Sequence, residues 1–130
     1  MIVLDGSAVV DLLLDVRPQA DRIRQEVLGG DLHAPHLLDV EVGQVLRRFV
    51  LAGALSEARA RRAVEHLGWL PITRYPHHGF LERALGLLRN LTVYDAVYVA
   101  LAEALDAPLL TRDAKLARAA RHRVAVRLVR

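Results

Sequence analysis

Residues 2–7 read Ile-Val-Leu-Asp-Gly-Ser, a short apolar run that ends in an acid. The apolar pattern then continues at helical spacing to Leu14. A buried strand that ends in an acidic turn and leads into a helix is typical of strand–helix–strand units. A second such run, Pro-Leu-Leu-Thr-Arg-Asp at residues 108–113, precedes a short basic helix. We therefore expect core strands at residues 2–4 and 108–111, and a ligand site just after them, where a doubly wound sheet binds its ligand.

The rest of the chain alternates between strand and helix patterns. Further strands are expected at residues 31–34, 71–73 and 124–129, and helices at residues 6–14, 18–28, 37–51, 56–67, 78–89 and 93–105. Parallel strands need crossover connections, which are normally right-handed helices. We therefore predict one α/β domain over residues 1–130, a three-layer α/β/α arrangement around a central parallel sheet of about five strands.

Composition narrows the class of protein. A chain of 130 residues with 53% apolar and 25% charged residues suits one compact domain and argues against disorder. The absence of cysteine excludes disulfides, zinc ribbons and cysteine nucleophiles. No run of 18 apolar residues lacks a charge, and the start does not resemble a secretory signal. We expect a cytoplasmic protein that does not associate with membranes.

Two acids stand in apolar surroundings. Asp5 is the only charged residue among the first ten, and Asp95 interrupts the apolar and aromatic run of residues 93–102. A buried carboxylate is costly unless it is paired, hydrogen-bonded or bound to a metal. Helix capping would explain either acid without any chemistry, because Asp5 or Ser7 would cap the following helix and Thr92 would form a capping box with Asp95.

Two further acids join this pattern. Glu41 stands at the edge of the apolar stripe of its helix and in line with Arg48, so it faces either a crevice or an arginine at the surface. Asp113 follows the second core strand, where an N-cap of the basic helix is its default role. A parallel sheet would bring Asp5, Asp95 and Asp113 to one edge, which Glu41 can join. Four crowded carboxylates need cations, and all-oxygen ligation suits Mg²⁺ or Mn²⁺.

Four segments together resemble PIN-domain ribonucleases and, more narrowly, the VapC toxins of toxin–antitoxin pairs. They are the opening Ile-Val-Leu-Asp-Gly-Ser, Leu-Leu-Asp-Val-Glu-Val around Glu41, Tyr-Asp-Ala at 94–96 and Leu-Thr-Arg-Asp at 110–113. The resemblance covers nearly the whole chain in order and spacing. It implies a PIN-like fold with an acidic metal site at Asp5, Glu41, Asp95 and Asp113, and hydroxyls that orient the carboxylates or their waters at Ser7 and Thr111.

The resemblance also implies an activity and partners. The expected protein is an endoribonuclease that uses Mg²⁺ or Mn²⁺ and a metal-activated water to cleave structured RNA of the tRNA or rRNA class. It would form a homodimer and be held inactive by a cognate VapB-like antitoxin. Two alternatives are a catalytically inactive PIN module that binds RNA or protein, and a receiver-like phospho-acceptor domain. A receiver needs a lysine near its acids, whereas the only lysine, Lys115, lies in a basic tail.

That tail, residues 112–130, carries seven cations and one acid. Arginine suits bidentate phosphate contacts. We expect the RNA backbone to lie beside the site on Arg112, Lys115, Arg118, Arg121 and Arg123. The alternative is an ordinary solvated basic face.

Two histidine pairs are spaced like metal ligands but lack a third nitrogen or sulfur partner. We expect His33, His36, His77 and His78 to be surface or loop residues.

Overall fold

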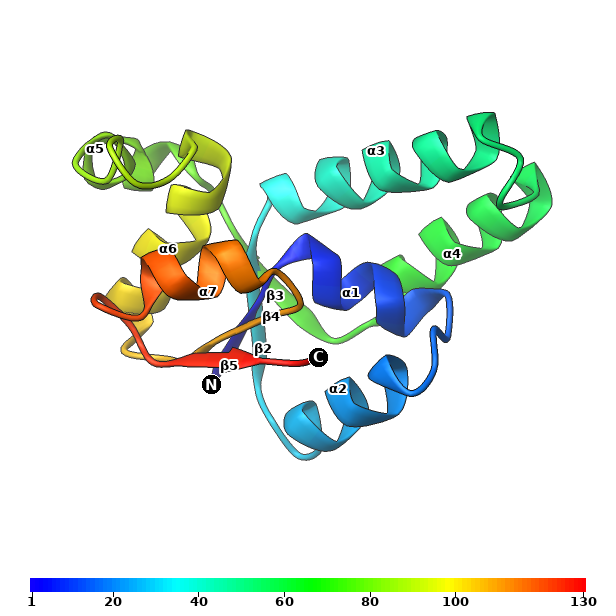
Figure 1. Ribbon diagram of the computed structural model, residues 1–130, viewed down its shortest axis with the longest axis horizontal. Coiled ribbons are helices and arrows are strands. Elements are labelled where there is room, and N and C mark those ends of the chain that lie inside the picture. Colours follow the sequence, from blue (N-terminus) through cyan, green and yellow to red (C-terminus); the bar gives the residue numbers. More distant parts are fainter.

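The computed structural model describes residues 1–130 and contains five strands and seven α-helices. The strands are β1 (Ile2–Leu4), β2 (Leu32–Pro35), β3 (Ile72–Tyr75), β4 (Leu109–Thr111) and β5 (Val126–Leu128). The helices are α1 (Gly6–Leu13), α2 (Gln19–Val27), α3 (Leu37–Leu51), α4 (Glu57–Trp69), α5 (Leu81–Leu85), α6 (Val93–Leu105) and α7 (Ala114–Ala120), with a 3₁₀ turn, η1 (His78–Phe80), before α5. Figure 1 shows their arrangement.

All strand pairs are parallel, in the order β3-β2-β1-β4-β5. The chain builds outward from β1 to β2 and β3, then returns to place β4 on the other side of β1. The switch point of the topology therefore lies between β1 and β4, where Val3 pairs with Leu109 and Leu4 with Leu110. In such sheets the crevice outside the carboxyl ends at the switch point is the usual ligand site. The next residues, Asp5 and Arg112, stand at that edge.

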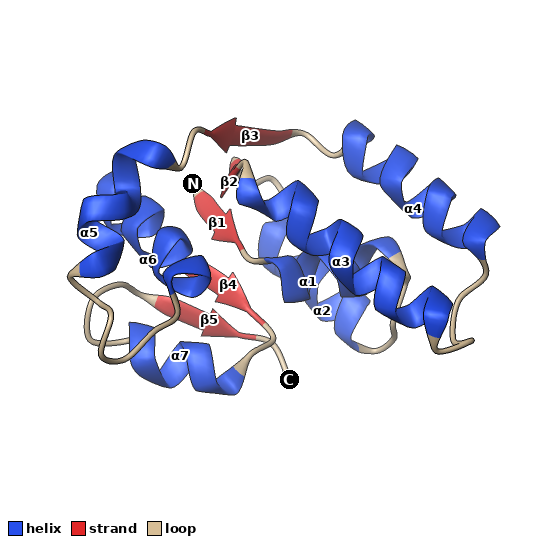
Figure 2. Cartoon of the chain, turned by 90° about the horizontal axis from the view of Figure 1, so that it is seen from above, coloured by secondary structure: helices blue, strands red, loops and turns tan.

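Two apolar cores cover the two faces of the sheet. The alternation of side chains along β1 sends Ile2 and Leu4 into one core and Val3 into the other. Helices α1 to α4 pack over the first face, and α5 to α7 over the second, as Figure 2 shows. The predicted three-layer α/β/α fold with a five-stranded parallel sheet is confirmed. No helix is long and apolar enough to cross a membrane.

The predicted elements agree with the structure except in two places. Residues 78–89 were expected to form one helix, but only η1 and α5 are helical and residues 86–90 form turns. Gly86 ends α5, and its backbone N–H caps carbonyls of the last turn. The last strand begins at Val126 rather than at residue 124, because Val124 still donates its N–H to the carbonyl of Ala120 at the end of α7.

Candidate active site

Asp5 follows β1 and is the N-cap of α1. Its Oδ1 accepts hydrogen bonds from the backbone N–H of Ala8 at 3.2 Å and the Ser7 hydroxyl at 2.7 Å. Its Oδ2 accepts from the Thr111 hydroxyl at 2.5 Å. The capping role is therefore confirmed, but a cap alone does not need two additional hydroxyl donors. Burial raises the pKa of Asp5, and the bonds from Thr111, Ser7 and Ala8 oppose that rise.

Ser7 and Thr111 join the two turns at the switch point. Thr111 is completely buried at the end of β4, and its Oγ1 also accepts from the backbone N–H of Asp113 at 2.9 Å. The Ser7 hydroxyl accepts from the backbone N–H of Arg112 at 3.1 Å. Both hydroxyls therefore link the Asp5 carboxylate to the end of β4.

Glu41 reaches the same edge from α3. Its Oε1 accepts a hydrogen bond from the Tyr98 hydroxyl at 2.5 Å. A Cβ placed on Gly6 would lie 3.7 Å from the Glu41 Cβ, so Glu41 lies over the turn that follows Asp5. Burial raises the pKa of Glu41, and the charges of Asp95 and Asp5 raise it further, against the Tyr98 bond. The crevice interpretation fits this placement, and the alternative, a surface ion pair with an arginine, is not formed.

Asp95 lies in the first turn of α6. Thr92 caps that helix by accepting from the backbone N–H of Asp95 at 3.2 Å. The return bond of a capping box, from the Thr92 N–H to the Asp95 carboxylate, is absent, so half of the predicted box is present. Burial raises the pKa of Asp95 and the charge of Asp113 adds to the rise, while Thr92 and the charge of Lys115 lower it. The pKa of the Asp95 carboxylate therefore depends on Asp113 as well as on Thr92 at its own helix end.

Asp113 is exposed at the start of α7. Its Oδ1 accepts from the backbone N–H groups of Lys115 and Leu116 at 2.9 and 3.1 Å, which confirms the predicted N-cap. Its charge adds to the rise that burial produces in the pKa of Asp95. The charge of Lys115, in the same basic tail, lowers the pKa of Asp95 but forms no salt bridge with it.

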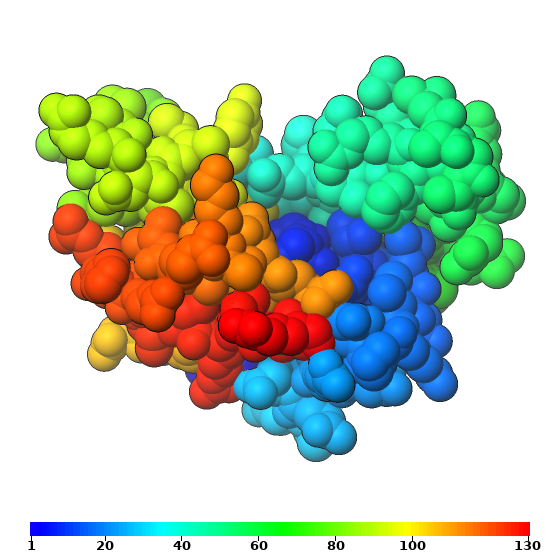
Figure 3. Space-filling view, viewed as in Figure 1, coloured from blue at the N-terminus to red at the C-terminus, as the bar shows by residue number.

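The four carboxylates form one repelling group without a salt bridge to any cation. The charge of Asp95 acts on Asp5 and on Glu41, and that of Asp113 acts on Asp95. Figure 3 shows a notch at the top of the molecule, between α3 and the start of α6. As placed, no three acidic or histidine side chains are close enough to share an ion, so ion binding would require side-chain movement. The four side chains offer only carboxylate oxygens, which are the ligands that Mg²⁺ and Mn²⁺ prefer.

Tyr98 was missed by the sequence analysis. It is 1% exposed, and its hydroxyl is the only hydrogen-bond donor to the Glu41 side chain. Burial and the bond to Glu41 raise the pKa of Tyr98, so the phenol remains a donor. The available signal was its position three residues after Asp95, on the same helical face.

The five cations proposed for RNA contacts divide into two groups. The guanidinium of Arg112 forms a salt bridge with Asp11 of α1 and donates to the Val129 carbonyl at 3.3 Å. Arg112 therefore holds α1 against the end of β5 and has an internal role that the sequence did not reveal. The other four are exposed and have no salt bridge: Lys115, Arg118, Arg121 and Arg123.

Arg112→Gln is expected to lower the free energy of unfolding by about 1–3 kcal/mol, because it leaves Asp11 and a carbonyl without their charged donor. The Arg112 and Asp11 side chains are only 27% and 17% exposed, so solvent replaces that donor poorly. Lys115→Gln, an exposed change of the same charge, should stay within about 0.5 kcal/mol of the parent. Urea unfolding measures both, and equal stabilities would contradict the internal role.

The histidines differ from expectation at one position. His33 is 5% exposed on β2, where its ring bonds Tyr75 Oη at 2.7 Å and Asp31 Oδ2 at 2.8 Å. The expectation of a surface or loop residue is therefore wrong for His33. His36, His77 and His78 are exposed, as expected.

The comparisons with known proteins identify the family and the fold. A family profile described as PIN domain matches residues 2–122. Ribonuclease VapC1 of Mycobacterium tuberculosis is 46% identical over 129 residues, which are 98% of this chain and 97% of the relative. Two solved structures share the fold. VapBC2 from Rickettsia felis, bound to a promoter DNA fragment, has a TM-score of 0.70 at 11% identity and covers all of both chains. VapC20 of M. tuberculosis, a sarcin–ricin loop cleaving toxin, has a TM-score of 0.70 at 13% identity, covering 92% of this chain and 95% of that one.

Proposed function

We infer that this chain, which belongs to the PIN-domain family and is a VapC-type ribonuclease, is a divalent-metal-dependent endoribonuclease that acts as a toxin. The observation that carries this proposal is the group formed by Asp5, Glu41, Asp95 and Asp113, in which no carboxylate has a cationic partner although burial raises the pKa of three of them. Such a group is costly in an isolated fold unless a cation or a reaction uses it. The 46% identity to VapC1, which extends over nearly the full length of both chains, supports the class of reaction.

Each residue of the site has a distinct proposed role. Asp5, Glu41, Asp95 and Asp113 would hold Mg²⁺ or Mn²⁺. When bound, the ion supplies a more acidic water and offsets negative charge at the scissile phosphate. Ser7 and Thr111 keep Asp5 in one orientation, because each donates to a different oxygen of its carboxylate. Tyr98 holds Glu41 toward the site, and no side chain serves as the nucleophile in this proposal.

The proposed substrate is structured RNA of the tRNA or rRNA class. The support is chemical and comparative, because exposed cations on α7 adjoin the acidic group, and the structural relative VapC20 is described as cleaving the sarcin–ricin loop. We further propose a homodimer that a VapB-like antitoxin inhibits. The Rickettsia felis relative, whose structure is of a VapBC complex, supports a partner of that kind.

Cleavage of end-labelled structured RNA by the purified protein tests the function. With Mg²⁺ or Mn²⁺ the RNA should be cut internally, and EDTA should stop the reaction because the carboxylates would lose the ion they hold. Fragments resolved by gel electrophoresis report both results. Cleavage at the same rate in EDTA would contradict metal dependence. RNA binding without cleavage in either metal would favour the catalytically inactive PIN module.

A further inference from the structure

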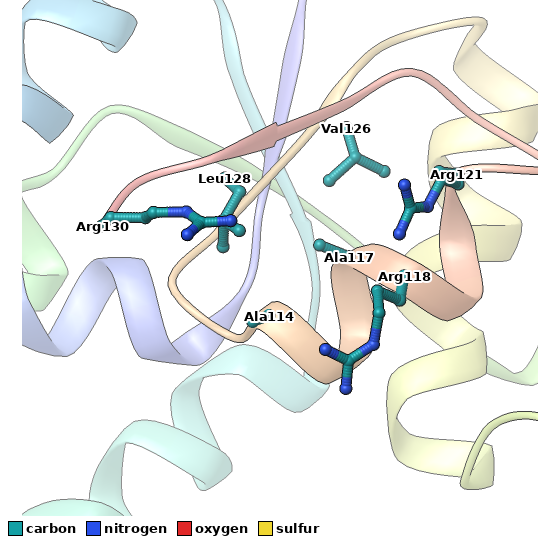
Figure 4. Close-up of a pocket in the computed structure, with 7 residues that line it drawn as sticks. All are labelled: Ala114, Ala117, Arg118, Arg121, Val126, Leu128 and Arg130. Carbon is teal, nitrogen blue, oxygen red and sulfur yellow. The ribbon is translucent and has the colours of Figure 1, made fainter.

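A pocket of about 310 Å³ lies between α7 and β5, and its lining begins at Ala114, the residue after Asp113. Three arginines line it, Arg118 and Arg121 from the α7 side and Arg130 from the end of the chain. Figure 4 shows Arg121 and Arg130 extending from opposite ends over an apolar floor that includes Val126 and Leu128. The pocket is large enough for a small ligand and combines positive charge with apolar surface.

The positive charge of this pocket is not balanced within the protein. No acid lines the pocket, and none of the three guanidinium groups forms a salt bridge or donates a hydrogen bond. Some arginines elsewhere are paired, for example Arg24 with Asp15 and Asp21, whereas here three arginines without an acidic partner line one cavity. The backbone at Arg130 is also held, because its carbonyl accepts from Arg22 of α2. The chain therefore positions three unpaired arginines around one cavity, which favours an anionic ligand.

The position of the pocket indicates which anion it would take. Asp113 of the proposed active site caps α7, and the pocket begins at the next residue, Ala114. Arg121 follows Asp113 by eight residues, which corresponds to about 12 Å along a helix axis. A stacked strand advances about 3.4 Å per nucleotide, so the far end of the pocket is about three to four nucleotides away. Figure 3 shows α7 and the C-terminal residues side by side on one face, beside the notch.

We propose that this pocket binds one nucleotide of the RNA strand, about three to four nucleotides from the bond that is cut. Arg118, Arg121 and Arg130 contact its phosphates, and the apolar floor contacts its sugar or base. The assignment rests on the proposed ribonuclease function. It adds Arg130 to the predicted RNA contacts and leaves Arg123, which does not line this pocket, outside it.

The test compares Arg121→Gln/Arg130→Gln with Arg59→Gln/Arg62→Gln, a matched pair on α4 whose guanidinium groups are also unpaired. Fluorescence anisotropy measures binding of a labelled single-stranded 12-mer RNA and of a dinucleotide, in EDTA to prevent cleavage. The pocket variant should bind the 12-mer about tenfold more weakly, with a salt slope flatter by up to about 1.4, or 0.7 per lost contact. The dinucleotide can occupy the pocket itself, so the pocket variant should bind it more weakly than the parent as well. The α4 variant should resemble the parent with both probes.

Each other outcome overturns the assignment. Equal 12-mer affinities for the two variants would show that the pocket arginines do not contact RNA. A hexaglutamate peptide serves as a second probe. If the pocket variant bound this peptide more weakly than the parent but bound RNA as tightly, the pocket would be assigned to an acidic protein instead. Cleavage by the parent is measured in parallel with Mn²⁺. A parent that cuts RNA while the variants bind alike overturns only the pocket, whereas a parent that neither binds nor cuts RNA overturns the function as well.

Discussion

Asp95→Asn is expected to reduce the rate of RNA cleavage by about 10²- to 10³-fold, the size of loss seen when one charge-stabilising group is removed from an active site. The charge of Asp95 raises the pKa of both Asp5 and Glu41. Asparagine keeps the size of the side chain and removes only its charge. The N-cap of α6 should persist, because Thr92 accepts from the backbone N–H of residue 95. The loss should therefore appear in turnover without unfolding.

Asp106→Asn is the matched control for this prediction. It makes the same chemical change at the other end of α6, where residue 106 is exposed and adopts a left-handed conformation that asparagine tolerates. Initial cleavage rates at saturating Mn²⁺, with circular dichroism of each variant, measure the difference. The control should retain the parent rate. An Asp95→Asn protein that cuts RNA as fast as Asp106→Asn would remove Asp95 from the proposed mechanism.

The sequence was sufficient to predict the part of the site that depends on strand ends. Short apolar runs that finish at Asp5 and before Asp113 predict parallel strands, and parallel strands bring their carboxyl ends to one edge. Local pattern therefore placed both acids, whereas the roles of the Ser7 and Thr111 hydroxyls were implied only by the resemblance. The caps at Asp5 and Asp113 were equally local, because each involves backbone N–H groups within three residues.

The contacts that the sequence could not predict join residues far apart in the chain. Glu41 stands at the edge of an apolar stripe, and its direction depends on a hydroxyl 57 residues away, at Tyr98. The sequence around Arg112 does not distinguish it from a solvated surface arginine, because its acidic partner, Asp11, is 101 residues away in the chain. His33 belongs to a strand that is buried on both faces, so it needs partners that only the packed sheet supplies. These polar contacts follow from tertiary packing rather than from periodicity.

The same Asp95→Asn change should stabilise the protein when metal is absent, which distinguishes a repelling acidic group from a set of helix caps. Burial and the charge of Asp113 raise the folded pKa of Asp95 above its ordinary value of 3.8. The folded state then binds more protons than the unfolded state between those two pKa values. The free energy of unfolding should therefore fall as pH rises through the unfolded pKa and level off above the folded pKa. An acid that served only as a cap would have a lowered pKa, and its stabilisation would be lost on acidification instead.

Thermal unfolding of the parent and of Asp95→Asn, each with EDTA and with Mn²⁺, separates these two cases. At neutral pH in EDTA the variant should melt above the parent, because it has one fewer repelling charge. Metal at about 100 times its Kd stabilises a folded state by about 2.7 kcal/mol, which corresponds to roughly 10 °C for a chain of this size. The parent should show most of that gain and the variant little of it, so the order of melting temperatures should reverse when metal is added. A variant that melts below the parent in EDTA and still gains as much from Mn²⁺ would identify Asp95 as a structural cap, because losing a ligand must weaken the stabilisation that the metal supplies.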